Sequence, residues 1–165
     1  MAYQNGKTFF ACGQPVIVRL ADGETHIFSV DGERLSTEDM SFGTLYGGGE
    51  GLELESVSVT LESGHLQALY GGGIGDTVKN VDITVNGGVV RSKYVGGGMA
   101  QSVGNVNIML NNAAAHTVMT GSEAEGAVIE DVANVTLNSG VVLNIKCGGG
   151  EILHQAAKTW VRFVV

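Results

Sequence analysis

The stretch YGGGIGDTVKNVDITVNGG, residues 70–88, joins three consecutive glycines to a run in which apolar and polar residues alternate. Val81, Ile83 and Val85 fall on one side of an extended chain, and the residues between them are polar. This alternation predicts a strand with one buried and one solvated face. The asparagine and two glycines that begin at Asn86 are typical of the turn that follows such a strand.

The same pattern recurs along the chain with a period of about 25 residues. Glycine triplets begin at Gly47, Gly71, Gly96 and Gly148, and a degenerate copy, TGSEAEG, begins at Thr120. Two further columns keep this spacing, with Ser56, Asn80, Asn105 and Asn134 before short alternating strands and turns at Glu62, Asn86, Asn111 and Asn138. Because the repeat has no helical periodicity, it indicates a coil of strands and corners whose equivalent residues stack about 4.8 Å apart.

We therefore predict an all-β fold, a right-handed parallel β-helix (β-solenoid) of about five rungs with roughly 25 residues per rung. The handedness is inferred from the chirality of strand connections and not from the spacing. No helix follows a glycine triplet, so the triplets are interpreted as corners with positive φ and not as phosphate-binding loops.

Stacking of the repeats predicts two ladders. Asn80, Asn105 and Asn134 are expected to bond through their side-chain amides. Tyr46 and Tyr70 are expected to stack beside the corner, and either Tyr94 or Val95 continues that column.

The stacked asparagine turns, the three-sided rung of this length and the inward valine and isoleucine columns resemble the right-handed parallel β-helix of the pectate-lyase-like superfamily over residues 43–150. The recurring string V-x-N-V-x-I-x-V followed by Y-G-G-G is also similar to repeats of bacterial surface and phage tail proteins. That superfamily holds lyases, hydrolases, adhesins and tailspikes on one scaffold, so the resemblance implies the fold and no particular activity.

A single domain is expected over residues 1–165, with an N-terminal cap and hairpin in 1–37, repeat rungs in 38–150 and a C-terminal cap strand in 151–165. Residues 16–30 read as two alternating strands around Asp22 and Gly23, a pair suited to a type I′ turn. At the other end, Trp160 and Phe163 are large enough to cover the open core or to face a neighbouring chain.

Charge, hydropathy and cysteine content limit the classes of partner, location and cofactor that the chain is expected to have. Nine lysines and arginines against 17 acidic residues give a net charge of −8, which disfavours direct nucleic-acid binding. Neither a membrane span nor a signal peptide is expected, which favours a cytoplasmic or virion-associated chain and leaves the location open. Cys12 and Cys147 form no CxxC motif and are interpreted as buried free thiols. No metal site and no cofactor are predicted.

The degenerate corner is the main irregularity. The interval from Gly121 to Asn134 is longer than the equivalent interval from Gly71 to Asn80, which predicts four inserted residues and a shortened strand after Asn134. The insertion brings together the acidic binding candidates Glu123, Glu125, Glu130 and Asp131. Paired carboxylates can serve as general acid and base or hold Ca²⁺, and the alternative interpretation is a solvated surface bulge.

Two further groups of residues are candidates. His116, on a strand near the acidic loop, gives with those carboxylates the one constellation worth testing for catalysis, although no catalytic motif is present. Arg91, Lys93 and Tyr94 form a basic and aromatic patch that suits a sugar or an acidic partner. No residue is assigned a catalytic role.

The favoured function is a non-enzymatic β-solenoid that presents a rigid face to a protein or glycan partner, as a phage tail or cell-surface module, within a homo-oligomer. One alternative is an acidic intracellular inhibitor, such as an anti-defence protein, that blocks a basic site on a partner protein. The other is a small polysaccharide lyase or hydrolase, which follows only from the superfamily resemblance.

Overall fold

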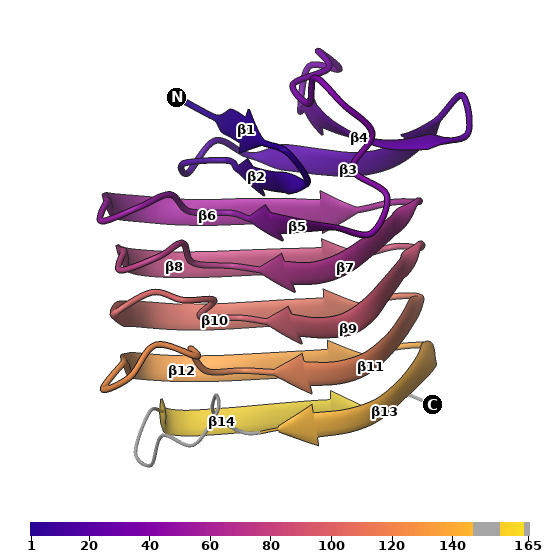
Figure 1. The fold of residues 1–165 in the computed structure, drawn as a ribbon. Helices are drawn as coiled ribbons and strands as arrows, with labels where there is room; N and C mark the ends of the chain where they lie inside the picture. The colour runs from indigo at the N-terminus through magenta and orange to yellow at the C-terminus, as the bar shows by residue number, and fades with distance from the viewer. Residues whose placement is uncertain (147–155, 164–165) are drawn as a thin grey trace.

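The computed structural model of this protein describes residues 1–146 and 156–163 (Figure 1). Over these residues the chain forms fourteen β-strands. The described residues contain no α-helix, and hence none that is long and apolar enough to cross a membrane. The predicted all-β class is confirmed.

The strands form two sheets, which we call sheet A and sheet B. Sheet A has the order β1 (Tyr3–Asn5), β2 (Thr8–Phe10), β5 (Gly43–Tyr46), β7 (His65–Tyr70), β9 (Val89–Val95), β11 (Ala113–Met119) and β13 (Gly140–Lys146). Sheet B has the order β14 (Ala156–Phe163), β12 (Val128–Leu137), β10 (Ser102–Leu110), β8 (Thr77–Val85), β6 (Glu53–Leu61), β3 (Val16–Ala21) and β4 (Glu24–Ser29). From β5 and β6 onward every pair within a sheet is parallel.

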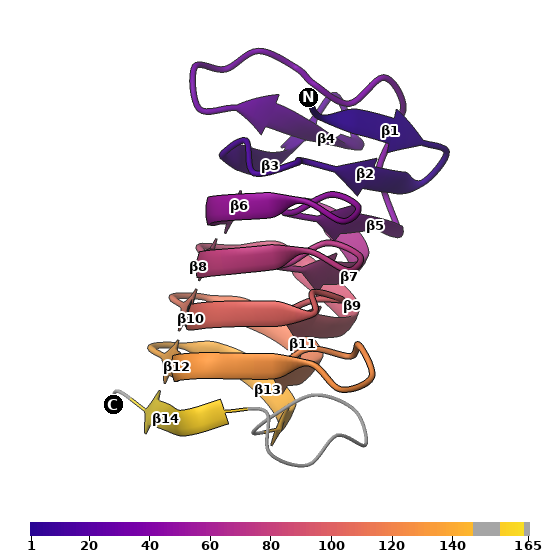
Figure 2. The ribbon, with the colours of Figure 1, turned by 90° about the vertical axis from the view of Figure 1, so that its left-hand side faces the viewer.

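One strand of sheet B and the following strand of sheet A make one coil, and the described chain contains four complete coils, from β6–β7 to β12–β13. In Figure 1 the strands of sheet A lie in front of those of sheet B and run in the opposite direction, so the coil descends in the right-handed sense. Figure 2 shows the two sheets side by side. The β-solenoid is confirmed, with about four turns where five were predicted. The count differs because each of the four described corners leads into one coil, while the triplet at Gly148 lies outside the described residues.

The core fills the space between the two sheets. Val81, Ile83 and Val85 are buried as the alternation predicts, and equivalent residues of each coil join them in one hydrophobic cluster. Val78 is also buried, three residues before Val81 instead of two, so the strand bends between them. The described strands form two sheets and no third one, and successive corners are joined by isolated bridges such as Glu50 to Ile74.

The asparagine column is only partly correct. Asn105 Nδ2 donates to Asn80 Oδ1 at 3.2 Å, as predicted. Asn134, however, pairs with Asn107 and donates to its Oδ1 at 3.0 Å, so it does not continue the predicted ladder. The three asparagines of the turn column form a ladder, because Asn138 donates to Asn111 and Asn111 donates to Asn86.

The insertion is also smaller than predicted. Ser102 pairs with Thr77 in the coil before it and with Val128 in the coil after it. The sequence separation between Ser102 and Val128 is one residue greater than that between Thr77 and Ser102. After a register shift, Val106 pairs with Val81 and with Ala133. The sequence separation between Val106 and Ala133 is two residues greater than that between Val81 and Val106. The chain therefore gains one residue in the corner and one in a bulge of β12, and no strand is shortened. The insertion is smaller than predicted because Asn134 pairs with Asn107 and not with Asn105, as the inward-facing Val135 pairs with Ile108.

Glycine triplets are required by close approach between coils. A Cβ on Gly71 would lie 2.0 Å from the carbonyl oxygen of Gly96, and one on Gly48 would lie 2.0 Å from Asp76 Oδ2. Of the three described triplets, only Gly98 has a positive φ. The positive-φ explanation is therefore wrong for most of these glycines, although their role as corners holds.

The N-terminal segment forms the cap. β3 and β4 pair antiparallel around Asp22 and Gly23, whose φ values of 51° and 78° confirm the predicted type I′ hairpin. β2 and β3 pair in parallel with β5 and β6, so the segment is also a first partial coil. Cys12 is a free, partly buried thiol at its corner, where burial raises its pKa.

An aromatic column lies beside the corners. Tyr46 stacks on Tyr70 with ring centroids 4.7 Å apart, as predicted, and Phe10 stacks on Tyr46 at 4.8 Å. Val95 follows Tyr70 in the register, while Tyr94 points into the core. The prediction for Cys147 lies outside the described residues, as do those for the side chains of Trp160 and Phe163.

Candidate functional site

The sequence-predicted site residues lie in three separate places. Arg91 and His116 line a groove on the outer face of sheet A. Lys93 and Glu123 meet at the corner beside the aromatic column. Glu130 and Asp131 line a polar hollow on sheet B, and Glu125 is exposed on the corner loop, where its carbonyl oxygen accepts from Gln101 Nε2 at 3.1 Å.

The groove on sheet A is apolar, with a volume of about 360 Å³. It crosses β9, β11 and β13, where outward positions carry Val89, Val141 and Leu143. Val141 and Leu143 are 64% and 67% exposed, although aliphatic side chains are usually withdrawn from water. Since alternation places every second residue of these strands outward, the exposed side chains form one surface on a flat sheet.

Arg91 stands at the edge of this groove. Its guanidinium lies over the ring of Phe42, 5.8 Å from the ring centroid, and the same ring contacts His65. Phe42 is itself 57% exposed and extends the apolar surface toward the first coil. The lining of the groove contains no carboxylate, and Arg91 has no ion pair within residues 1–146.

At the corner, Glu123 holds the loop onto the outside of sheet A. Its carboxylate forms an ion pair with Lys93 and accepts from Tyr70 Oη at 3.2 Å. The Lys93 ammonium also lies 5.7 Å from the Tyr70 ring centroid. Burial opposes the charge on Lys93, but Glu123 raises its pKa, and burial together with the same carboxylate raises the pKa of Tyr70. Glu123, Lys93 and Tyr70 therefore bond one another.

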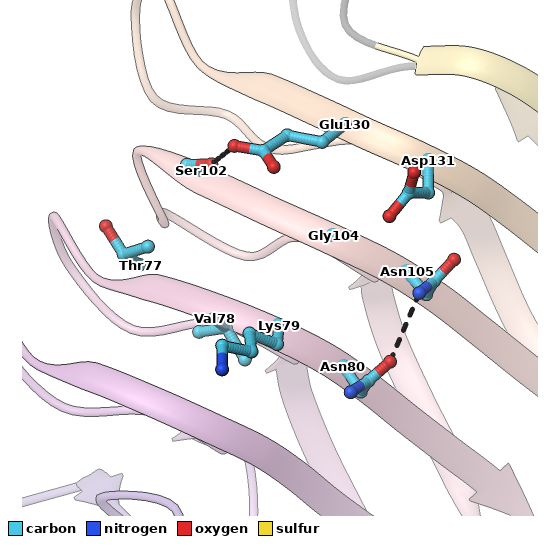
Figure 3. A pocket seen from close by; sticks show the side chains of 9 residues that line it. All are labelled: Thr77, Val78, Lys79, Asn80, Ser102, Gly104, Asn105, Glu130 and Asp131. Atoms are coloured by element: carbon cyan, nitrogen blue, oxygen red, sulfur yellow. Dashed lines mark hydrogen bonds between the residues drawn. The ribbon is translucent and has the colours of Figure 1, made fainter.

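The polar hollow on sheet B also has a volume of about 360 Å³. Lys79 on β8 and the acidic pair on β12 lie on either side of β10 (Figure 3). Ser102 Oγ donates to Glu130 Oε1 at 2.7 Å, and Lys79 forms an ion pair with Glu55 at 2.8 Å. Because Glu55 neutralises Lys79, the hollow keeps a negative balance from Glu130 and Asp131.

Gly104 creates this hollow, and it was missed in the sequence. It occupies the place between Lys79 and Glu130 in the stacked column, where a side chain would fill the space (Figure 3). A Cβ there would lie 2.4 Å from the carbonyl oxygen of Lys79. The sequence signal is a glycine in the middle of an alternating strand, which indicates close backbone approach.

Asp76 was also missed. Its fully buried carboxylate accepts from the backbone N–H groups of Gly49, Leu52 and Gly73 at 2.7, 2.8 and 3.0 Å. A buried charge needs such partners, so Asp76 ties two consecutive corners together. An aspartate directly after a glycine corner was the available signal.

The catalytic constellation is not assembled. His116 bonds Thr117 Oγ1 through Nδ1 at 2.9 Å and faces the groove of sheet A, whereas Glu130 and Asp131 belong to sheet B. Glu123 is engaged by Lys93 and Tyr70. Within the described residues, no three histidine, cysteine or acidic side chains are grouped so that they could hold a metal ion.

The basic and aromatic patch is divided as well. Tyr94 is fully buried, and burial raises the pKa of its hydroxyl. Its ring belongs to the core, whereas Arg91 lies at the groove and Lys93 at the corner. Arg91 and His116 are therefore the predicted residues that the structure brings together in an open groove.

No protein-family model matches this chain, and no curated protein or solved structure matches it either.

Proposed function

We propose that this chain is a non-enzymatic binding protein that presents the outer face of sheet A to a protein partner, as a phage tail or cell-surface module does. The observation that carries the proposal is the apolar groove of sheet A with Val141 and Leu143 exposed beside it. Contiguous exposed apolar side chains are typical of protein interfaces, and stacked coils keep them in a fixed arrangement. The separation of His116 from the carboxylates supports binding over catalysis.

The test compares two surface variants on opposite faces. Leu143→Glu places a charge in the apolar surface, and Thr84→Glu places the same charge on the outside of sheet B. Purified chains are applied to a protein array and a glycan array. We expect a protein ligand that Leu143→Glu loses and Thr84→Glu keeps. The absence of any protein ligand, or equal loss in both variants, would contradict the proposal.

Self-association belongs to the same proposal and is measured separately. Light scattering coupled to size exclusion gives the mass of the wild-type chain in solution. A homo-oligomer unaffected by Leu143→Glu would use another face and leave the groove for the partner.

A second candidate function is an acidic inhibitor that occupies a basic site on another protein. The polar hollow favours it, because Glu130 and Asp131 line it on β12, and the adjoining hollow on the same face is lined by Glu53 and Glu55 of β6. Opposite charges at an interface increase association rates and make binding sensitive to salt.

The double substitution Glu130→Gln with Asp131→Asn tests this candidate against a panel of basic nucleic-acid-binding proteins. The inhibitor hypothesis expects binding that weakens with salt and is lost in the double variant. Leu143→Glu would leave that binding unchanged, so the two candidate functions give opposite results.

A further inference from the structure

The groove of sheet A combines two features that usually do not occur together in an acidic chain. Its lining is aliphatic apart from Arg91 and His116, and it includes no carboxylate. The chain as a whole carries a net charge of −8. The groove is thus a locally basic and apolar region on an acidic protein.

Five other cations of residues 1–146 have partners, whereas Lys146, at the end of β13 and outside the groove lining, forms no ion pair within the described residues. Lys7, Arg19, Lys79 and Lys93 each form an ion pair with a carboxylate, and Arg34 donates to the carbonyl oxygen of Ser36. Arg91 contacts the Phe42 ring and, within the part of the chain that the structure describes, has no carboxylate partner. Stacking on the ring uses one face of the guanidinium and leaves its N–H donors at the edge.

We propose that the groove of sheet A binds a protein segment that carries an aliphatic side chain next to a carboxylate, with the carboxylate on Arg91 and the aliphatic group against Val141 and Leu143. This inference rests on the function proposed above and names the chemistry of the partner. A planar guanidinium held on an aromatic ring accepts a carboxylate in a two-pronged arrangement that an ammonium cannot reproduce.

A second copy of the chain is a poorer occupant. Two copies each carrying −8 repel one another. If two grooves met face to face, each Arg91 would approach the Arg91 or His116 of the other copy without a carboxylate between them. Charge complementarity therefore favours an acidic and apolar segment of a different protein.

The probe is a library of random twelve-residue peptides displayed on phage and selected on the full chain. We expect enriched peptides to pair Leu, Ile or Val with Asp or Glu. Binding of one synthesised enriched peptide is then measured by fluorescence anisotropy. The affinity should fall at least tenfold in Arg91→Gln and in Leu143→Ser, and it should weaken between about 50 mM and about 500 mM salt because the ion pair is screened.

Two matched variants serve as controls. Arg19→Gln removes a half-buried arginine of the cap that pairs with Glu62, and the affinity of this variant should equal that of the wild type. Arg91→Lys keeps the charge but not the planar donors, and its affinity should fall between those of the wild type and Arg91→Gln. Both Arg91 and Leu143 are exposed, so folding is checked by circular dichroism and expected to be unchanged.

The outcomes separate this inference from the proposed function. If Leu143→Ser abolishes peptide binding while Arg91→Gln does not, the groove binds a partner but the carboxylate assignment is wrong. If neither substitution matters, or no peptide is enriched, both proposals fail. A wild-type dimer that Leu143→Ser dissociates would make a second copy the occupant and overturn the inference.

Discussion

The Asp76 carboxylate accepts a hydrogen bond from the backbone N–H of Gly49, 2.7 Å away and one coil earlier in the chain. Two more backbone N–H groups donate to the same buried carboxylate. Each glycine corner exposes backbone donors that no side chain of the triplet can satisfy, so this aspartate stabilises the contact between consecutive coils.

Asp76→Asn should therefore lower the free energy of unfolding by about 2 to 3 kcal/mol, because an amide presents an N–H₂ group to at least one donor and removes the charge from the remaining bonds. Urea denaturation followed by circular dichroism gives the value. Asp82→Asn, on the exposed side of the same coil, is the control and should stay within about 0.5 kcal/mol of the wild type. Equal losses in the two variants would contradict this role.

Gly104→Ala should destabilise the chain by about 1 to 3 kcal/mol, since its Cβ would lie 2.4 Å from the Lys79 carbonyl oxygen and neighbouring strands would have to separate. Adding Lys79→Ala should not restore stability, because the clash is with the backbone. Thermal unfolding of the single and double variants measures both effects. Full rescue by the second substitution would show that the Lys79 side chain, and not the backbone, limits the space.

Tyr94→Phe should leave stability unchanged or raise it by about 1 kcal/mol. The Tyr94 hydroxyl is buried and finds no hydrogen-bond partner within the described part of the chain, so its removal relieves a desolvation cost. Tyr70→Phe is the matched comparison and should destabilise, because Tyr70 Oη donates to Glu123. A loss of stability in Tyr94→Phe would indicate that the hydroxyl has a bonding partner.

The N-terminal cap should weaken in acid through Asp39. Burial tends to raise the pKa of Asp39, but hydrogen bonds from Ser41 and Thr25, together with Lys7, lower it to about 2. Because this value lies below that of an unfolded aspartate, near 3.9, the stabilisation is complete above about pH 4 and is lost as the pH falls toward about 2. The free energies of unfolding of the wild type and of Asp39→Asn should differ most at about pH 4 and least at about pH 2. Parallel curves would rule out the contribution of Asp39.

The coil was predictable because three of its causes repeat in the sequence. Inward valines and isoleucines, turn asparagines and glycine corners each recur with nearly the same spacing, so one coil predicts the next. The type I′ hairpin at Asp22 and Gly23 was equally local. The site was harder to predict from the sequence. The position of Arg91 over Phe42 depends on how the coils stack, which brings the residue before β5 close to β9.

The wrong predictions for the Asn134 ladder and for the size of the insertion have one physical source, the register of β12. Asn134 resembles Asn105 by its neighbours in sequence, but the bulge in β12 shifts the register so that Val135 packs at the level of Ile108. Burial of the inward side chains decides the register, because a slip of one residue would turn every apolar side chain outward. A hydrogen bond of a surface asparagine contributes too little free energy to change the register that burial sets. Asn134 therefore bonds the neighbour that this register places beside it.

This difference in register is directly testable through a double-mutant cycle at Asn134. With Asn134 Nδ2 bonded to Asn107 Oδ1 at 3.0 Å, the substitutions Asn134→Ala and Asn107→Ala should be coupled by about 0.5 to 1 kcal/mol in the free energy of unfolding. Asn134→Ala and Asn105→Ala should be additive within about 0.3 kcal/mol, because Asn105 bonds Asn80 instead. Urea denaturation of the wild type, the two single variants and the double variant completes each cycle. Coupling of Asn134 to Asn105 and not to Asn107 would contradict the bulge in β12 and support a continuous ladder of Asn80, Asn105 and Asn134.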